Sequence, residues 1–153
     1  MFGKIKALAF TGVLAATAFA ATGAHAAGWI VGLVDGKSIV TIDPASRKVA
    51  SKVEVKGAGP LSGIDVRPAD GMLYGVAADG TIFTVDIKSG QAAMKSKMSE
   101  ALKPGVIATI DFNPVADRLR VMGSDGTSLR VNVDDGKATV DGCLLYTSPS
   151  PRD

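Results

Sequence analysis

The sequence predicts an all-β fold, and three observations support this prediction. Residues 63–92 recur without a gap at residues 109–138, at an offset of 46 positions (Ile64 to Ile110), and ten of the thirty paired positions are identical. Each copy alternates short apolar segments with turns that contain Asp-Gly or Pro. Four short strands per 46 residues fit the length of a β-propeller blade. We therefore expect a partial β-propeller that follows a secretory signal peptide.

The expected strands make about two and a half four-stranded blades. An open β-sandwich and a β-solenoid are the alternatives, but a solenoid coil is usually shorter and a sandwich needs no such faithful repetition. The first unit has an Asp35-Gly36 turn but lacks the strand that opens the other two, so it begins midway through a blade. Ser99 to Lys103 is the one helical hint, a single turn that Pro104 ends. The expected strands are 29–34, 38–42 and 49–55, then 61–66, 73–77, 82–86 and 92–97, then 106–112, 119–123, 129–133 and 138–141.

Residues 1–26 have the pattern of a secretory signal peptide. Lys4 and Lys6 precede an apolar run over residues 7–21, and Ala24-His25-Ala26 is a small-x-small cleavage site. A membrane anchor or a buried helix is the alternative, but the run is short for a span and no stop-transfer segment follows. We expect cleavage near Ala26/Ala27, a periplasmic or extracellular protein, and no membrane span after cleavage.

Residues 143–153, CLLYTSPSPRD, share no pattern with the repeated units. They resemble the conceptual translation of a transposase-type sequencing adapter, and a natural Pro-rich tail is the alternative. We therefore expect a non-native tail after a truncated repeat domain over residues 27–142.

Composition excludes several classes of site from residues 27–142. Of the 17 Lys and Arg residues in the chain, all but Lys4, Lys6 and Arg152 lie in this range, and of the 15 Asp and Glu residues, all but Asp153 do. The range therefore holds 14 basic and 14 acidic residues, and its net charge is zero. This balance does not fit a nucleic-acid partner. The only Cys and the only His of the chain, Cys143 and His25, lie outside this range, which excludes disulfides, Cys/His zinc sites and His-based triads within it. No cofactor and no catalytic residue are predicted.

Four side chains are the candidate ligand-facing residues. Asp65 and Asp111 occupy equivalent places in an Ile-Asp-x-x-Pro segment, and Arg67 and Asn113 follow two residues later on the same strand face. If this strand is innermost, the four side chains ring a channel mouth and coordinate a cation or an anionic ligand. The alternative is that each Asp accepts backbone N–H bonds in the turn before Pro68 or Pro114.

Two further groups have simpler interpretations. Asp134-Asp135-Gly136, with Asp141 nearby, suggests calcium, but it lacks EF-hand spacing and aligns with the plain turn Lys88-Ser89-Gly90. Three arginines of the third unit suggest a basic patch, but acidic residues lie close by in sequence. We expect a turn and a solvated, ion-paired face, respectively. The three arginines are Arg118, Arg120 and Arg130.

The segments GIDVRPADGMLYGV, DGTIFTVD and TIDFNPVADRLRVM resemble the bacterial exported proteins grouped as domain-of-unknown-function family 4394. The likeness runs from about Trp29 to Gly142. It implies a propeller-like protein longer than this chain, and it implies no catalytic residues.

These observations favour an exported, non-enzymatic binding or interaction module for an unknown small-molecule or protein ligand. A propeller hydrolase or lactonase-type enzyme with a carboxylate-held metal is one alternative, and a structural envelope component is another. Because the end units of a propeller arc expose apolar faces, we expect this chain on its own to aggregate.

Overall fold

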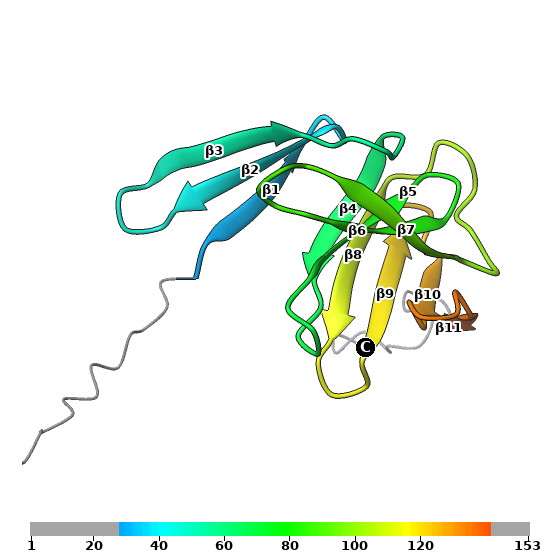
Figure 1. Cartoon of the computed structure of the whole chain (residues 1–153). Helices are drawn as coiled ribbons and strands as arrows, with labels where there is room; N and C mark the ends of the chain where they lie inside the picture. The colour runs from blue at the N-terminus through cyan, green and yellow to red at the C-terminus, as the bar shows by residue number, and fades with distance from the viewer. Residues whose placement is uncertain (1–27, 142–153) are drawn as a thin grey trace, which may run out of the picture.

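The computed structural model describes residues 28–141, which form eleven strands in three antiparallel sheets (Figure 1). No helix is present among these residues, and none of the three sheets closes on itself. The predicted signal peptide (1–26) and the predicted tail (143–153) lie outside the described residues. The all-β prediction is confirmed.

The three sheets follow one another along the chain. Within each sheet, consecutive strands are neighbours, so every connection is a hairpin turn. The first sheet contains β1 (Ile30–Val34), β2 (Ser38–Asp43) and β3 (Lys48–Glu54); the second contains β4 (Leu61–Val66), β5 (Leu73–Ala77), β6 (Thr81–Val85) and β7 (Ala92–Lys97); the third contains β8 (Ala108–Asn113), β9 (Arg118–Gly123), β10 (Ser128–Val131) and β11 (Ala138–Asp141).

Every expected strand is present, and four have the expected bounds at both ends: β4, β5, β7 and β11. The helical turn expected at residues 99–103 is wrong, because this segment is an irregular loop. Ser99 is instead held by the third sheet: its N–H donates to the carbonyl of Gly136 over 2.9 Å, and its Oγ accepts from the N–H of Ala138 over 3.0 Å. These bonds take the place of a helix cap.

The sheet β4–β7 lies between the other two and packs on both faces. Leu73, Phe83 and Val85 on one face join Ile39 of β2 in one apolar core. On the opposite face, Tyr74, Val76 and Ile82 pack against apolar residues of β8–β11 and form a second core with them. This alternation follows from the two-residue period of a strand. The residues of β8–β11 in that core are Ile110, Phe112, Leu119, Val121, Leu129 and Val131, with Val133 beyond β10.

The same kind of backbone hydrogen bond occurs at both places where one sheet packs on the next, which we call the joints between sheets. The turn between β6 and β7 places the carbonyl of Gly90 2.9 Å from the N–H of Lys56, just after β3. The turn between β10 and β11 places the carbonyl of Gly136 2.9 Å from the N–H of Ser99, just after β7. Both glycines have φ +75°, and a Cβ on either would collide with the backbone of the preceding sheet. Gly is therefore required at both positions.

The first sheet has three strands where the others have four. Within residues 28–141, this sheet has no strand that corresponds to β4 and β8, so β1 is an edge strand in the described part of the chain.

Candidate functional site

Asp65 lies at the end of β4 and links this strand to the next sheet. Its Oδ2 accepts a hydrogen bond from the backbone N–H of Phe112 over 2.7 Å, and its Oδ1 accepts from the N–H of Val66 over 2.8 Å. Phe112 belongs to β8 and is 4 % exposed. The carboxylate thus satisfies a buried N–H that has no strand partner on that side. The alternative prediction, that Asp65 accepts N–H bonds only within its own turn, covers one of its two donors. The other donor, Phe112, belongs to the neighbouring sheet.

Arg67 is the centre of a polar cluster between β4–β7 and β8–β11. It is 9 % exposed, and its Nε donates to Asp117 Oδ1 over 2.8 Å. Its Nη2 also donates to Asp117 Oδ2 and, over 3.0 Å, to Asp134 Oδ2. The guanidinium therefore reaches two separate turns of the third sheet, the one before β9 and the one after β10. Such a forked contact suits Arg, which presents several N–H groups in one plane.

Tyr74 and Asp70 complete this cluster from the side of β4–β7. Arg67 Nη1 donates to Tyr74 Oη and to Asp70 Oδ2, each over 3.3 Å. Tyr74 Oη in turn donates to Asp70 Oδ2 over 2.9 Å. The guanidinium carbon also lies 5.9 Å from the Tyr74 ring centroid, and this ring packs edge-on against Phe112 at 5.3 Å. One arginine thus ties together an aromatic contact and three carboxylates.

The electrostatics of this Arg67 cluster favour its charged form. Hydrogen bonds from Arg67 lower the pKa of the Asp117 and Asp134 carboxyls, and Lys95, 2.9 Å from Asp134, lowers the pKa of Asp134 further. The same bonds to Asp117 and Asp134 raise the pKa of Arg67, which stays protonated. Burial is the main cause that raises the pKa of the Tyr74 hydroxyl. Every member of the cluster has a hydrogen-bond or ion-pair partner, so the cluster stabilises the packing of the two sheets.

Asp111 and Asn113 occupy the corresponding places on β8, but their surroundings differ from those of Asp65 and Arg67. Asp111 is exposed and lies opposite Arg120 in the register of β8 and β9. Asn113 Oδ1 accepts from the N–H groups of Val115 and Ala116 over 2.9 and 3.0 Å. Asn113 is thus a turn cap.

The four candidate residues do not converge. Asp65 and Arg67 lie between two sheets, whereas Asp111 and Asn113 lie on the face of β8–β11 that points away from β4–β7. We call this the outer face of β8–β11. The ligand-binding role of the four residues stays a prediction, and Asp111 is the member whose carboxylate is exposed to solvent.

The outer face of β8–β11 also carries the three arginines of the predicted ion-paired surface. Arg130 Nη2 lies 2.7 Å from Asp141 Oδ1, and Arg120 Nη2 lies 3.8 Å from Asp141 Oδ2. Arg118 instead donates to the carbonyls of Ala116 and Asp117. The ion-paired interpretation is confirmed for two of the three arginines. Their partner is Asp141, not the acidic residues that are close in sequence.

Sequence reasoning missed Asp117 and Asp134 as partners of Arg67, because 50 and 67 residues separate them from it. The turn interpretation of residues 134–136 is confirmed, since Gly136 donates to the carbonyl of Asn132 over 2.8 Å. The one signal in the sequence was a mismatch between the two units: Arg67 corresponds to Asn113, so the two positions could not share one role.

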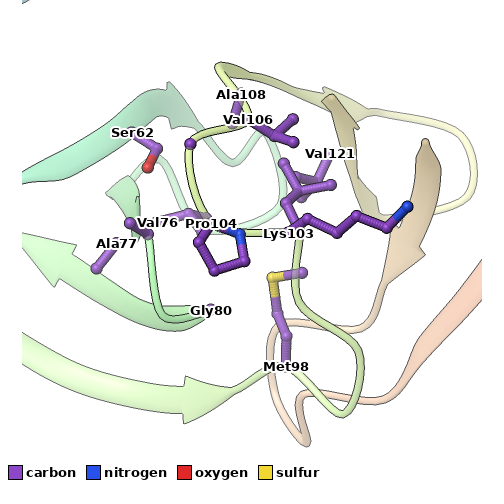
Figure 2. Close-up of a pocket in the computed structure, with 13 residues that line it drawn as sticks. Ser62, Val76, Ala77, Gly80, Met98, Lys103, Pro104, Val106, Ala108 and Val121 are labelled. Atoms are coloured by element: carbon purple, nitrogen blue, oxygen red, sulfur yellow. The ribbon is translucent and has the colours of Figure 1, made fainter. Parts of the chain in front are cut away.

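A small cavity lies between the β5–β6 turn, the loop at 102–106 and β9 (Figure 2). Its volume is about 40 Å³, and side chains such as Met98, Pro104 and Val121 line it. Pockets that bind metabolites are about 300 Å³ or larger, so this cavity has space for water only. In the described part of the chain, no group of three His, Cys, Asp or Glu residues could hold a metal ion. Residues 28–141 also include no helix that could cross a membrane.

The sequence profile of a family described as Domain of unknown function (DUF4394) matches residues 38–152. This range contains all of the described chain from β2 onward, including both four-stranded sheets. No curated protein matches the chain. The match covers more than half of the sequence, and the chain therefore belongs to the DUF4394 family of domains of unknown function.

Proposed function

We propose that this chain is an exported, non-enzymatic binding or interaction module built like part of a β-propeller. The three sheets are successive blades, the first of them incomplete. Two features support this architecture: each joint between sheets uses the same glycine contact, at Gly90 and at Gly136, and each packs one sheet face on the next. Export rests on the signal-peptide pattern of residues 1–26.

The observation that carries the binding role is the polar chemistry of the outer face of β8–β11. In the central sheet, the corresponding positions hold Tyr74, Val76 and Ile82, which are at most 3 % exposed and pack on the next sheet. In β8–β11, the residues 46 positions later are Arg120, Met122 and Ser128. Within the described residues, the same backbone therefore places the charged side chains of Arg120 and Asp111 where its sister sheet has a core, while Ser128 is buried. A rigid sheet with aligned polar side chains is a suitable platform for a ligand.

The binding role is tested by melting curves of the chain with a panel of neutral sugars, amino acids, oxyanions and divalent cations. We expect at least one compound to raise the melting temperature of the wild type and of Lys52→Ala, an exposed change on β3. The double variant Arg118→Ala/Arg130→Ala, which removes two cations from the outer face of β8–β11, should lose this response. Mass spectrometry should recover the compound unchanged, as a non-enzymatic role requires.

Two results would reject the binding role: no compound of the panel shifts the melting temperature, or the double variant responds as the wild type does. Export is tested separately. Expression of the chain in a bacterium should give a periplasmic product whose N-terminus lies at or near Ala27, and a cytoplasmic product that retains residues 1–26 would reject export.

A further inference from the structure

The outer face of β8–β11 contains a groove of about 360 Å³ on strands β9 to β11 and the turn between β10 and β11. A second groove, of about 540 Å³, lies on the central sheet. The two grooves are related by the 46-residue spacing, because five of the six residues that line the first correspond to residues that line the second. The six are Arg118, Arg130, Asn132, Asp135, Lys137 and Thr139, and the five counterparts are Met72, Thr84, Asp86, Gln91 and Ala93. The fold thus builds the same groove twice.

The chemistry of the two grooves differs at the positions that correspond. Met72, Thr84 and Gln91 are neutral, and their counterparts are Arg118, Arg130 and Lys137. The groove on the central sheet is lined by one acidic and one basic residue, Asp86 and Lys88, and has no net charge. The groove on β9–β11 has three cations and one carboxylate, that of Asp135, so its lining has a net charge of +2. We call it the basic groove.

Packing within the sheet does not account for these cations. Arg130 lies directly opposite Arg120 in the register of β9 and β10, and like charges in that position destabilise a sheet. The sister sheet avoids this cost, since the corresponding pair is Tyr74 and Thr84. Asp141 offsets part of the repulsion, because it contacts both arginines. Of this pair, only Arg130 lines the groove, where its positive charge faces the space that an anion would occupy.

Two of the cationic side chains are already held in position. Arg130 donates through Nε and Nη2 to Asp141, and Arg118 donates through Nη1 to the carbonyls of Ala116 and Asp117. A guanidinium has five N–H donors, so both arginines keep donors for a ligand. Lys137 has no acidic partner within 4 Å among the described residues. The hydroxyl of Thr139 on β11 adds a neutral donor at the same groove.

We propose that the basic groove is a binding site for a small multivalent oxyanion, such as a phosphate or a polycarboxylate group. The proposal deepens the binding role proposed above and rests on it. Arg118 and Arg130 supply oriented N–H donors, Lys137 supplies a third positive charge, and Thr139 supplies a hydroxyl. The matching groove on the central sheet has no such set and does not bind these anions.

Titration calorimetry of the chain with inorganic phosphate, pyrophosphate and citrate tests this proposal. The key variant is Arg118→Met/Arg130→Thr/Lys137→Gln, which places in the basic groove the residues of the sister groove. A matched control, Lys48→Gln/Lys52→Gln/Lys56→Gln, removes the same number of charges from exposed positions of the first sheet and the segment after it. We expect at least one anion to bind the wild type and the control alike. The groove variant should bind about tenfold more weakly or worse.

Added salt should weaken binding to the wild type, because the contact is between charges near the surface. Equal binding by the groove variant and the wild type would overturn the proposal, and so would the failure of all three anions to bind the wild type. A neutral compound that shifts the melting temperature of the wild type while no oxyanion binds would reject the oxyanion site and leave the binding role standing. Should the triple variant fail to fold, Lys137→Gln, a change of one exposed side chain, is compared in the same titrations and should weaken binding measurably.

Discussion

The sheets β4–β7 and β8–β11 have the same strand order but use their matching faces differently. In both, an Asp-Gly-Thr segment forms the turn between the second and third strands: Asp79 accepts from the N–H of Thr81 over 3.0 Å, and Asp125 accepts from Thr127 over 3.1 Å. Several residues that are identical in the two units, such as these aspartates and the glycines at 90 and 136, therefore build turns and joints. Residues that differ, such as Tyr74 and Arg120, give the two matching faces different chemistry. The comparison thus separates residues that hold the backbone in place, which we call the scaffold, from residues that set the chemistry of a face.

If the two joints have the same scaffold role, substitution of either joint glycine should lower the free energy of unfolding by a similar amount. Gly90→Ala and Gly136→Ala should each destabilise the fold by about 2–4 kcal/mol, because a Cβ collides with the preceding sheet and the residue has a positive φ. Gly71→Ala is the matched control: its φ is +69°, but nothing lies within 4 Å of the added Cβ. It should cost about 1–2 kcal/mol from the backbone alone. Urea unfolding measures all three, and a similar cost at all three positions would contradict the packing role of the joints.

The Arg67 cluster predicts an unequal effect at corresponding positions. Arg67→Asn, which introduces the residue found at position 113, should cost about 2–3 kcal/mol, because it leaves the carboxylates of Asp117 and Asp134 without their shared cation. This figure is at the low end for a buried ion pair, since the two Asp side chains are 37 % and 51 % exposed. Asn113→Ala should cost about 1 kcal/mol through the lost turn cap. Equal unfolding midpoints of the two variants would show that the cluster adds nothing beyond a turn.

The two aspartates of the Ile-Asp segments sharpen the comparison further. Asp65→Ala should cost about 1–3 kcal/mol, because the buried N–H of Phe112 loses its acceptor. Asp111→Ala should change stability by less than about 0.5 kcal/mol, because its carboxylate is exposed. Thermal melting of both variants in one buffer is the measurement. A destabilising Asp111→Ala would mean that the outer face of β8–β11 is covered in the folded protein.

The smallest expected effect is the part of the pH dependence of stability that comes from the Arg67 cluster. Arg67 lowers the pKa of Asp117 and Asp134 in the folded state. The two carboxylates therefore stabilise the folded state fully at any pH above their pKa in the unfolded chain, which is about 4. This stabilisation is lost as the pH falls through their lower pKa values in the folded state. The gap in unfolding midpoint between the wild type and Arg67→Asn should narrow from pH 7 to about pH 3. A gap that stays constant over this range would argue against the ion pairs as its cause.

The sequence predicted the strands and turns well because their signals are local. Alternating apolar residues and Asp-Gly turns act within a few positions, and the expected strands at 61–66, 73–77, 92–97 and 138–141 have the observed bounds. The one wrong element, the helical turn at 99–103, failed because Ser99 bonds to residues near position 137, which no local pattern reveals. For the candidate site, sequence indicated that Asp65 and Arg67 are special but not what they contact.

By itself, the sequence determined the all-β fold, the recurrence of four strands at a 46-residue spacing, and the absence of His and Cys from residues 27–142. Only the tertiary structure decided the roles of the two Ile-Asp segments. The packing of β8–β11 on β4–β7 buries Arg67 among carboxylates 50 and 67 residues away and leaves Asp111 in solvent. The physical reason is that a polar side chain takes its role from the charges and donors around it, and those come from whichever sheet packs against it.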